Sequence, residues 1–352
     1  MTMGQSADPV LQDGVKRHSR FLEPKAPPKG GEEASAGRPE FSTLPLQLGR
    51  LDSAPELEGY QSQPGQMPAA ARGKVGLLRL GFSLKNGRSI LHDLYRVAPL
   101  LVQQALYWDE AMPELPICSI ISVGGGILQG DRYKIDITVE EGACAHVGTQ
   151  GANRVQRMDA NYASQHQTLN VASGAYLEYL PDFTIPYRSS RFINQTEIVV
   201  ADNATVLYGE MVMSGRKHHH VDERFGFDLL SMSVDVVRPD GRALFSEKIL
   251  VEKDEPTIGY PAVMKGFDAF ASIMCLTPPD VAARIEERFE PSWSDESPRA
   301  ISGVSRLPNE AGLTLRVAGI ESYDVRAEVR RFWRIVREEA RSRTLPDEFL
   351  WR

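Results

Sequence analysis

The chain has 352 residues, 42% hydrophobic and 25% charged, which is typical of a globular protein rather than a disordered one. Its net charge of -7 and isoelectric point near 5.6 argue against a nucleic-acid-binding protein, which would carry a basic excess or stripe. Three cysteines without metal-ligand spacing, no leader pattern and no apolar run of membrane-spanning length together predict a cytoplasmic protein with buried, unpaired thiols.

The first 70 residues differ in composition from the rest of the chain. They hold nine of the 23 prolines and few apolar clusters. Such a segment cannot bury enough apolar surface to offset the entropy lost on ordering. We therefore predict a flexible N-terminal arm over residues 1–70, one β-rich domain over residues 73–343 and a short tail over residues 344–352.

A repeated five-residue pattern organises the β-like region that follows. The pattern V-x-x-[Gly/Asn]-A begins at Val139, Val171 and Val200, at spacings of 32 and 29 residues. Its fourth position holds Gly142, Gly174 or Asn203, the residue types that best tolerate a left-handed backbone. We expect each to close a hairpin with a local bulge. The spacing fits stacked units of a β-solenoid or three ordinary hairpins of a sandwich. The pattern therefore predicts a mostly β fold of stacked hairpins and leaves both arrangements open.

The C-terminal third changes to a helical period. Residues 263–275 and 280–288 are candidate helices, residues 292–308 resemble a loop, and residues 313–317 resemble a strand. Apolar residues from Val325 to Val336 then fall on one stripe of a helix. The other face carries arginines, which we expect to be solvated: Arg330, Arg331, Arg334 and Arg337.

The loop Ser122–Asp131 has the glycine spacing of a phosphate-binding loop, from Gly125 to Gly130. Asp131, however, stands where that loop needs a lysine, and a carboxylate there would repel a triphosphate. We therefore predict a tight turn in which Gly125, Gly126 and Gly130 meet backbone requirements.

The chain has neither a G-x-S-x-G elbow nor an H-E-x-x-H motif. Its one histidine cluster is Lys217-His218-His219-His220. In an extended segment His218 and His220 would face the same side and could bind nickel or zinc. The alternative is a surface loop that is rich in histidine by chance.

Several stretches, in order, resemble the family of the urease accessory protein UreD, also called UreH. They are Gly124–Asp131, Thr149–Val155, Leu177–Pro181 with Ile185–Tyr187, and Gly215-Arg216 with Arg316-Val317 and Trp333. The resemblance covers about residues 73–343. It implies a non-enzymatic scaffold that binds urease apoprotein, UreF and, through UreF, the nickel-carrying GTPase UreG. It also implies that no cofactor is tightly bound and that Ni²⁺ passes transiently through an internal route. The fold that it implies is a two-layer, β-helix-like arrangement with a few helices in the C-terminal third.

We hypothesise that buried polar groups of the resembling motifs line this nickel route. The candidates are Asp131, Gln150, Asn153, Glu178 and Asp182. The alternative for each is that it satisfies backbone groups in a tight turn. Two other classes stay open, a β-solenoid binding module without a metal role and an all-β hydrolase with His146 or His166 as base.

Overall fold

The computed structural model describes residues 54–61, 75–253, 258, 263–264, 266–293 and 298–347. The chain divides into two compact units, Met1–Pro55 and Glu56–Arg352, and the description below concerns the second. The predicted arm lies almost wholly outside the described residues, as does most of the predicted tail, so both stay predictions.

The first of two β-sheets, here called sheet 1, has seven strands. Its five inner strands are parallel, and an antiparallel strand closes each side. In spatial order the strands are β14 (Ala243–Glu252), β13 (Leu229–Val237), β11 (Arg191–Val200), β8 (Ala163–Val171), β5 (Arg132–Val139), β1 (Val75–Lys85) and β2 (Arg88–Val97).

The second sheet, sheet 2, has ten strands, of which β4, β6, β9 and β12 run parallel to one another. The main spatial order is β16 (Ala300–Arg306), β17 (Gly312–Gly319), β15 (Ala269–Leu276), β12 (Thr205–Met213), β9 (Tyr176–Tyr179), β6 (Cys144–Thr149), β4 (Ile117–Ser122) and β3 (Leu100–Leu101). Two short strands, β7 (Asn153–Val155) and β10 (Thr184–Pro186), pair with each other beside this order.

The repeated turns connect the two sheets. Each leads from a strand of sheet 1 into a strand of sheet 2, namely β5 to β6, β8 to β9 and β11 to β12. The prediction that Gly142, Gly174 and Asn203 close hairpins is therefore wrong, because the flanking strands do not pair with each other. Gly142 and Gly174 have the expected left-handed φ of 67° and 65°.

Asn203 has no left-handed backbone, contrary to expectation, and its side chain instead fixes the neighbouring turn. Its Oδ1 accepts a hydrogen bond from the Gly174 N–H at 3.0 Å, and its Nδ2 donates to Ser173 Oγ at 3.0 Å. The Gly142 N–H in turn donates to the Ser173 carbonyl at 3.0 Å. Successive turns are thus hydrogen-bonded to one another, which accounts for the recurrence of the pattern.

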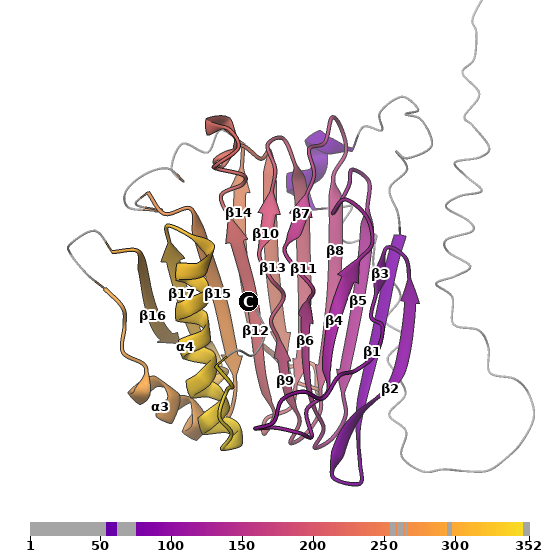
Figure 1. The fold of residues 1–352 in the computed structure, drawn as a ribbon, viewed down its shortest axis with the longest axis vertical. Coiled ribbons are helices and arrows are strands. Elements are labelled where there is room, and N and C mark those ends of the chain that lie inside the picture. Colours follow the sequence, from indigo (N-terminus) through magenta and orange to yellow (C-terminus); the bar gives the residue numbers. More distant parts are fainter. Residues whose placement is uncertain are drawn as a thin grey trace, which may run out of the picture. The chain divides into compact units, whose positions relative to one another are not determined.

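The prediction of a mostly β, two-layer protein with a few helices is confirmed (Figure 1). The two sheets are not closed, so the β-helix part of that prediction is not confirmed. Among the described residues, the α-helices are α3 (Pro279–Arg288) and α4 (Ser322–Arg341), and short 3₁₀ turns occur at η1 (Pro55–Tyr60), η2 (Val221–Glu223) and η3 (Pro308–Glu310).

Two elements of the C-terminal third differ from expectation. The segment predicted as a helix over residues 263–275 contains strand β15, and the predicted loop over 292–308 contains strand β16. Both faces of β15 are buried, with Ile273 packed toward the helices and Met274 toward the space between the sheets. A strand that is apolar on both faces has no alternation, so periodicity cannot distinguish it from a helix.

The protein has two main hydrophobic cores. One lies between the sheets, and the other lies between sheet 2 and the helices α3 and α4. The second core is built around Phe332 and Trp333, both fully buried. None of the described helices is long and apolar enough to cross a membrane.

Candidate functional site

A group of polar side chains interrupts the apolar core between the two sheets. We call it the polar seam: Gln165, Gln167, Tyr179, Asn194, Thr196, Tyr208 and Glu210. The parallel register of β8 and β11 sets Gln165 beside Asn194 and Gln167 beside Thr196. These positions would ordinarily be filled by apolar residues, as Leu169 and Ile198 are further along the same strands.

Hydrogen bonds link the polar seam across both sheets. Gln167 Nε2 donates to Asn194 Oδ1 at 3.1 Å and to Thr196 Oγ1 at 2.9 Å. From sheet 2, the Tyr179 hydroxyl donates to Gln167 Oε1, and the Tyr208 hydroxyl lies 2.9 Å from Thr196 Oγ1. The seam is therefore a connected network in which buried polar atoms satisfy one another.

Glu210 supplies the one carboxylate of the polar seam. Its Oε1 accepts hydrogen bonds from the Tyr208 hydroxyl at 2.6 Å and from Asn194 Nδ2 at 2.9 Å. Burial raises the pKa of Glu210 to about 7, although these two hydrogen bonds oppose the rise. The sequence analysis missed this residue. The available signal was a lone acidic residue inside the apolar strand that runs from Thr205 to Met213.

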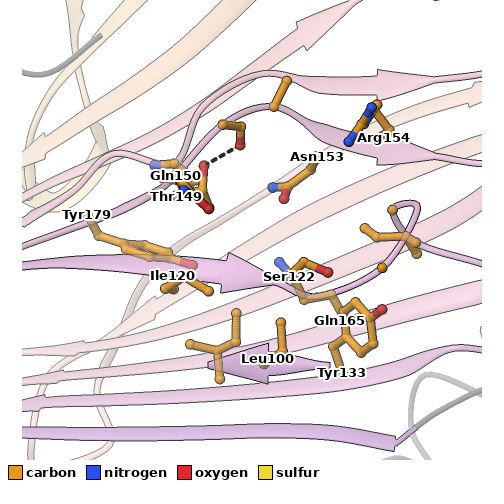
Figure 2. A pocket seen from close by; sticks show the side chains of 17 residues that line it. Leu100, Ile120, Ser122, Tyr133, Thr149, Gln150, Asn153, Arg154, Gln165 and Tyr179 are labelled. Carbon is orange, nitrogen blue, oxygen red and sulfur yellow. Dashed lines mark hydrogen bonds between the residues drawn. The ribbon is translucent and has the colours of Figure 1, made fainter. Parts of the chain in front are cut away.

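A cavity of about 330 Å³ opens beside the polar seam. Figure 2 shows side chains from both sheets around it, and its polar lining includes Ser122, Tyr133, Gln150, Asn153, Gln165 and Tyr179. A smaller cavity of about 20 Å³, enough for one water molecule, shares Asn153, Gln165 and Pro181 with it. Asp182 and Glu210 also line the smaller cavity. The shared walls place the two cavities next to each other, with carboxylates at the smaller one.

Three of the five predicted route residues lie at these cavities. Gln150 lines the larger cavity, Asn153 lines both, and Asp182 lines the smaller one. The Asp182 carboxylate also accepts a hydrogen bond from Arg326 at 2.5 Å and one from the Phe183 N–H at 2.7 Å.

Asp131 lines neither cavity but holds the glycine loop. Its buried carboxylate accepts hydrogen bonds from the Leu128 N–H at 2.8 Å and from the Tyr133 hydroxyl at 2.7 Å. Gly126, with φ at 120°, has no room for a side chain, since a Cβ there would lie 2.3 Å from the Arg154 carbonyl oxygen. Gly130 is left-handed as well, with φ at 80°. Gly125 has open space around it, so nothing in the structure explains a glycine at that position.

Glu178 lies on the other face of sheet 2, against helix α4, and is fully buried. Its carboxylate accepts hydrogen bonds from Arg337 at 2.8 and 2.9 Å, from Trp333 at 2.7 Å, from His146 at 2.8 Å and from Tyr176 at 2.7 Å. Burial disfavours the charged form, but Arg337 outweighs it and holds the pKa of Glu178 well below its ordinary value. Glu178 is therefore not brought together with the cavity residues.

The expectation that Arg337 is solvated is wrong. Its side chain is fully buried between Glu178 and Asp109, both of which pair with it. Two carboxylates on segments distant in sequence supply the compensating charge that makes this burial possible. Helical periodicity places Arg337 beside the other arginines but gives no sign of these partners.

The histidine cluster lies in a turn rather than an extended segment. The side chains of His218 and His220 are 78% and 61% exposed. His220 Nδ1 accepts a hydrogen bond from the Asp222 N–H at 3.2 Å and so caps η2. Throughout the described part of the chain, no group of three or more His, Cys, Asp or Glu residues is arranged to hold a metal ion. The assignment of His218 and His220 as metal ligands therefore stays a prediction.

The remaining candidates for chemistry are placed away from both cavities. His146 is buried beside Glu178 and stacks on Trp333, with ring centroids 5.3 Å apart. His166 lies next to Lys134, and burial together with that lysine lowers its pKa to about 4. All three cysteines are free and buried, as predicted.

The fold and the site together define a class of protein, a two-sheet β protein in which a buried polar network lies beside a cavity. Comparison with known proteins gives the particular family. The family model described as UreD urease accessory protein matches residues 74–352, so the chain belongs to the UreD family.

Relatives agree over most of their length. Urease accessory protein UreD 2 of Methylorubrum extorquens is 73% identical over 310 residues, which cover 88% of this chain and all of the relative. Urease accessory protein UreD 3 of Methylorubrum populi is 71% identical over the same length and coverage. The UreD protein of Yersinia pseudotuberculosis is 50% identical over 300 residues, which cover 85% of this chain and 93% of the relative. The predicted family membership is confirmed.

Proposed function

We propose that this protein is a non-catalytic scaffold for nickel incorporation into apo-urease. In this proposal it bridges urease to UreF and, through UreF, to the GTPase UreG, and it does so in the cytoplasm. Nickel is cargo that passes through the protein and is not a resident cofactor. Family membership supports a role in urease maturation, and the site supports the finer assignment.

The polar seam and its cavities are the observation that carries the proposal. A metal ion in transit needs ligands that can replace part of its hydration shell yet release it again. Amide and hydroxyl oxygens with few carboxylates meet this need better than a closed set of strong ligands. The larger cavity is lined mainly by amide, hydroxyl and apolar groups, with Arg154 as its one charged residue, and Asp182 and Glu210 are the carboxylates of the smaller one, so carboxylates are few.

The proposed route therefore enters at Gln150, passes Asn153 and reaches Asp182 and Glu210. Asp131 and Glu178 are left out of this route. The carboxylate of Asp131 holds the glycine loop, and that of Glu178 neutralises Arg337. Both carboxylates then stabilise the folded protein, and we expect substitution of either to reduce the amount of folded protein.

Substitution of the seam carboxylate tests the route. Glu210→Gln keeps the shape of the side chain and one oxygen that can accept the bonds from Tyr208 and Asn194, but it removes the charge. Co-expressed with urease, UreF and UreG, this variant should still assemble with its partners but should leave urease with less nickel and less activity. The matched control is Glu197→Gln, an acidic residue on β11 between Thr196 and Ile198, which face the seam and the core.

Nickel content and complex formation are measured separately in this experiment. Normal nickel content with Glu210→Gln would remove Glu210 from the route. If variants of Asn153 and Asp182 also assemble normally and also give urease its normal nickel content, the binding-module alternative is favoured. Failure of the wild-type chain to co-purify with urease, UreF and UreG would contradict the scaffold role itself.

A further inference from the structure

At two of the four sheet edges, another segment bonds to the outward backbone groups of one residue. At β2, the Ser89 N–H donates to the Glu114 carbonyl at 3.2 Å, and the Ser89 carbonyl accepts from the Tyr107 hydroxyl at 2.8 Å. At β16, Ser302 exchanges two backbone hydrogen bonds with Ser292 at 2.9 and 3.0 Å. The third edge strand, β3, is only two residues long. Closing or shortening an edge prevents it from pairing with another chain.

The fourth edge is formed by β14 in sheet 1. The Lys253 N–H donates to the Asp228 carbonyl at 2.7 Å, so the odd-numbered residues of β14 direct their backbone groups toward β13. The even-numbered residues consequently direct theirs outward. The Leu244 carbonyl is capped by Asn309 Nδ2 at 2.5 Å. At positions 246, 248, 250 and 252, no described residue bonds to the outward backbone groups.

Charged and apolar side chains follow a simple order along this stretch of β14. On the outer face, Lys248 and Leu250 are 45% and 42% exposed, and Glu252 is also exposed. On the inner face, Ile249 and Val251 are half-buried against the core. An apolar centre is thus flanked by a basic residue at one end and an acidic residue at the other.

We propose that the open edge of β14 binds an extended segment of a partner protein by adding it to sheet 1 as an antiparallel strand. This segment has a basic residue, then three apolar residues, then an acidic residue. In antiparallel register its basic residue lies opposite Glu252 and its acidic residue opposite Lys248, where it joins the Glu56 carboxylate that already pairs with Lys248 at 2.7 Å. Backbone hydrogen bonds at 248, 250 and 252 supply affinity, and the flanking charges supply register.

A peptide probe can test this because β14 itself has the required order, from Lys248 to Glu252. The probe is a labelled peptide of residues 246–253, Ser-Glu-Lys-Ile-Leu-Val-Glu-Lys. The control peptide, Ser-Lys-Glu-Ile-Leu-Val-Lys-Glu, has the same composition but places like charges opposite each other. Fluorescence anisotropy with the full chain should give binding at least about tenfold tighter for the probe than for the control.

A pair of protein variants tests the backbone contribution. Leu250→Pro removes one outward N–H donor that β13 does not use, so sheet 1 should remain intact while probe binding falls about tenfold or more. Leu250→Ala keeps that donor and should bind within about threefold of the wild type. Circular dichroism checks that both variants are folded.

A charge variant keeps the proposal testable if Leu250→Pro does not fold. In Glu252→Lys, the basic residue of the probe would lie opposite a lysine. The ratio of probe affinity to control-peptide affinity should therefore fall. Equal binding of the two peptides to the wild type, or no detectable binding of the probe, would overturn the proposal. Unchanged probe affinity in a folded Leu250→Pro variant would do the same.

Discussion

Two of the buried carboxylates, Glu210 and Glu178, behave in opposite ways. Glu210, in the polar seam, is surrounded by neutral donors, and burial raises its pKa to about 7. Glu178, between sheet 2 and α4, is paired with Arg337, which holds its pKa well below the ordinary value. The comparison teaches that partner charge, rather than burial, decides whether a buried carboxylate is locked in one state.

The two regions also differ in how open they are. Glu178 is bonded to four neighbouring side chains and lines no cavity, whereas Glu210 lines the smaller cavity. A permanently ionised and fully bonded carboxylate stabilises the fold. A carboxylate that has neutral partners and lies beside a cavity can exchange partners, as cation passage requires. The following experiments separate the two roles.

The largest effect is expected at the charged region. Arg337→Ala leaves Glu178 and Asp109 buried without their counter-charge, which should destabilise the protein by about 3–5 kcal/mol. Urea unfolding followed by circular dichroism measures this loss. Arg334→Ala, on the same helix with a 45% exposed side chain, is the control and should change stability by less than about 0.5 kcal/mol. Equal losses for the two variants would contradict the assigned role of Arg337.

The pH dependence of stability should reveal Glu210. Its pKa is raised from 4.5 to about 7, so the folded state binds a proton more tightly than the unfolded state does. The contribution to stability is then full below about pH 4.5 and is lost as pH rises through 7, with a total of about 3 kcal/mol. Unfolding free energies of wild type and Glu210→Gln, compared between pH 5 and 8, should show this fall only in the wild type. Parallel curves would contradict the raised pKa.

A smaller effect is expected in the glycine loop, where two adjacent glycines provide a matched pair. Gly126→Ala places a methyl group 2.3 Å from the Arg154 carbonyl in a left-handed backbone and should cost about 1–3 kcal/mol. Gly125→Ala has open space and should change stability by less than about 0.5 kcal/mol. Thermal unfolding of the two variants distinguishes them. Similar melting temperatures would show that the loop can move away from the added group.

The smallest effect is expected at the histidine cluster. Because both side chains are largely exposed, the double variant His218→Ala, His220→Ala should change stability by less than about 0.5 kcal/mol. If the predicted metal site forms, equilibrium dialysis against Ni²⁺ should lose one weak site in this variant. An unchanged number of bound ions would exclude these two residues as ligands.

The sequence analysis predicted those features that depend on local patterns. The β character, the left-handed Gly142 and Gly174, and the helix with its apolar stripe from Val325 to Val336 all follow from residue type and spacing. Contacts between distant segments could not be predicted in the same way. Examples are the burial of Arg337 by Asp109 and the position of Glu210 beside Asn194.

The strands buried on both faces were also beyond local reasoning. In β15 the absence of polar alternation removes the signal that distinguishes a strand from a helix. The repeated turns were recognised, but the sequence could not tell that their flanking strands belong to different sheets. That distinction depends on which strands pair, and pairing partners lie about 30 residues apart.

The passage of nickel through the cavities is the central claim, and blocking their shared wall tests it most directly. Asn153→Trp adds bulk where the two cavities meet while leaving every carboxylate in place. Arg157→Trp, at a side chain that is 74% exposed, is the matched control. Urease co-expressed with the Asn153 variant should form its complex with the accessory proteins but contain much less nickel than with the control. Full nickel content with Asn153→Trp would contradict a route through this site.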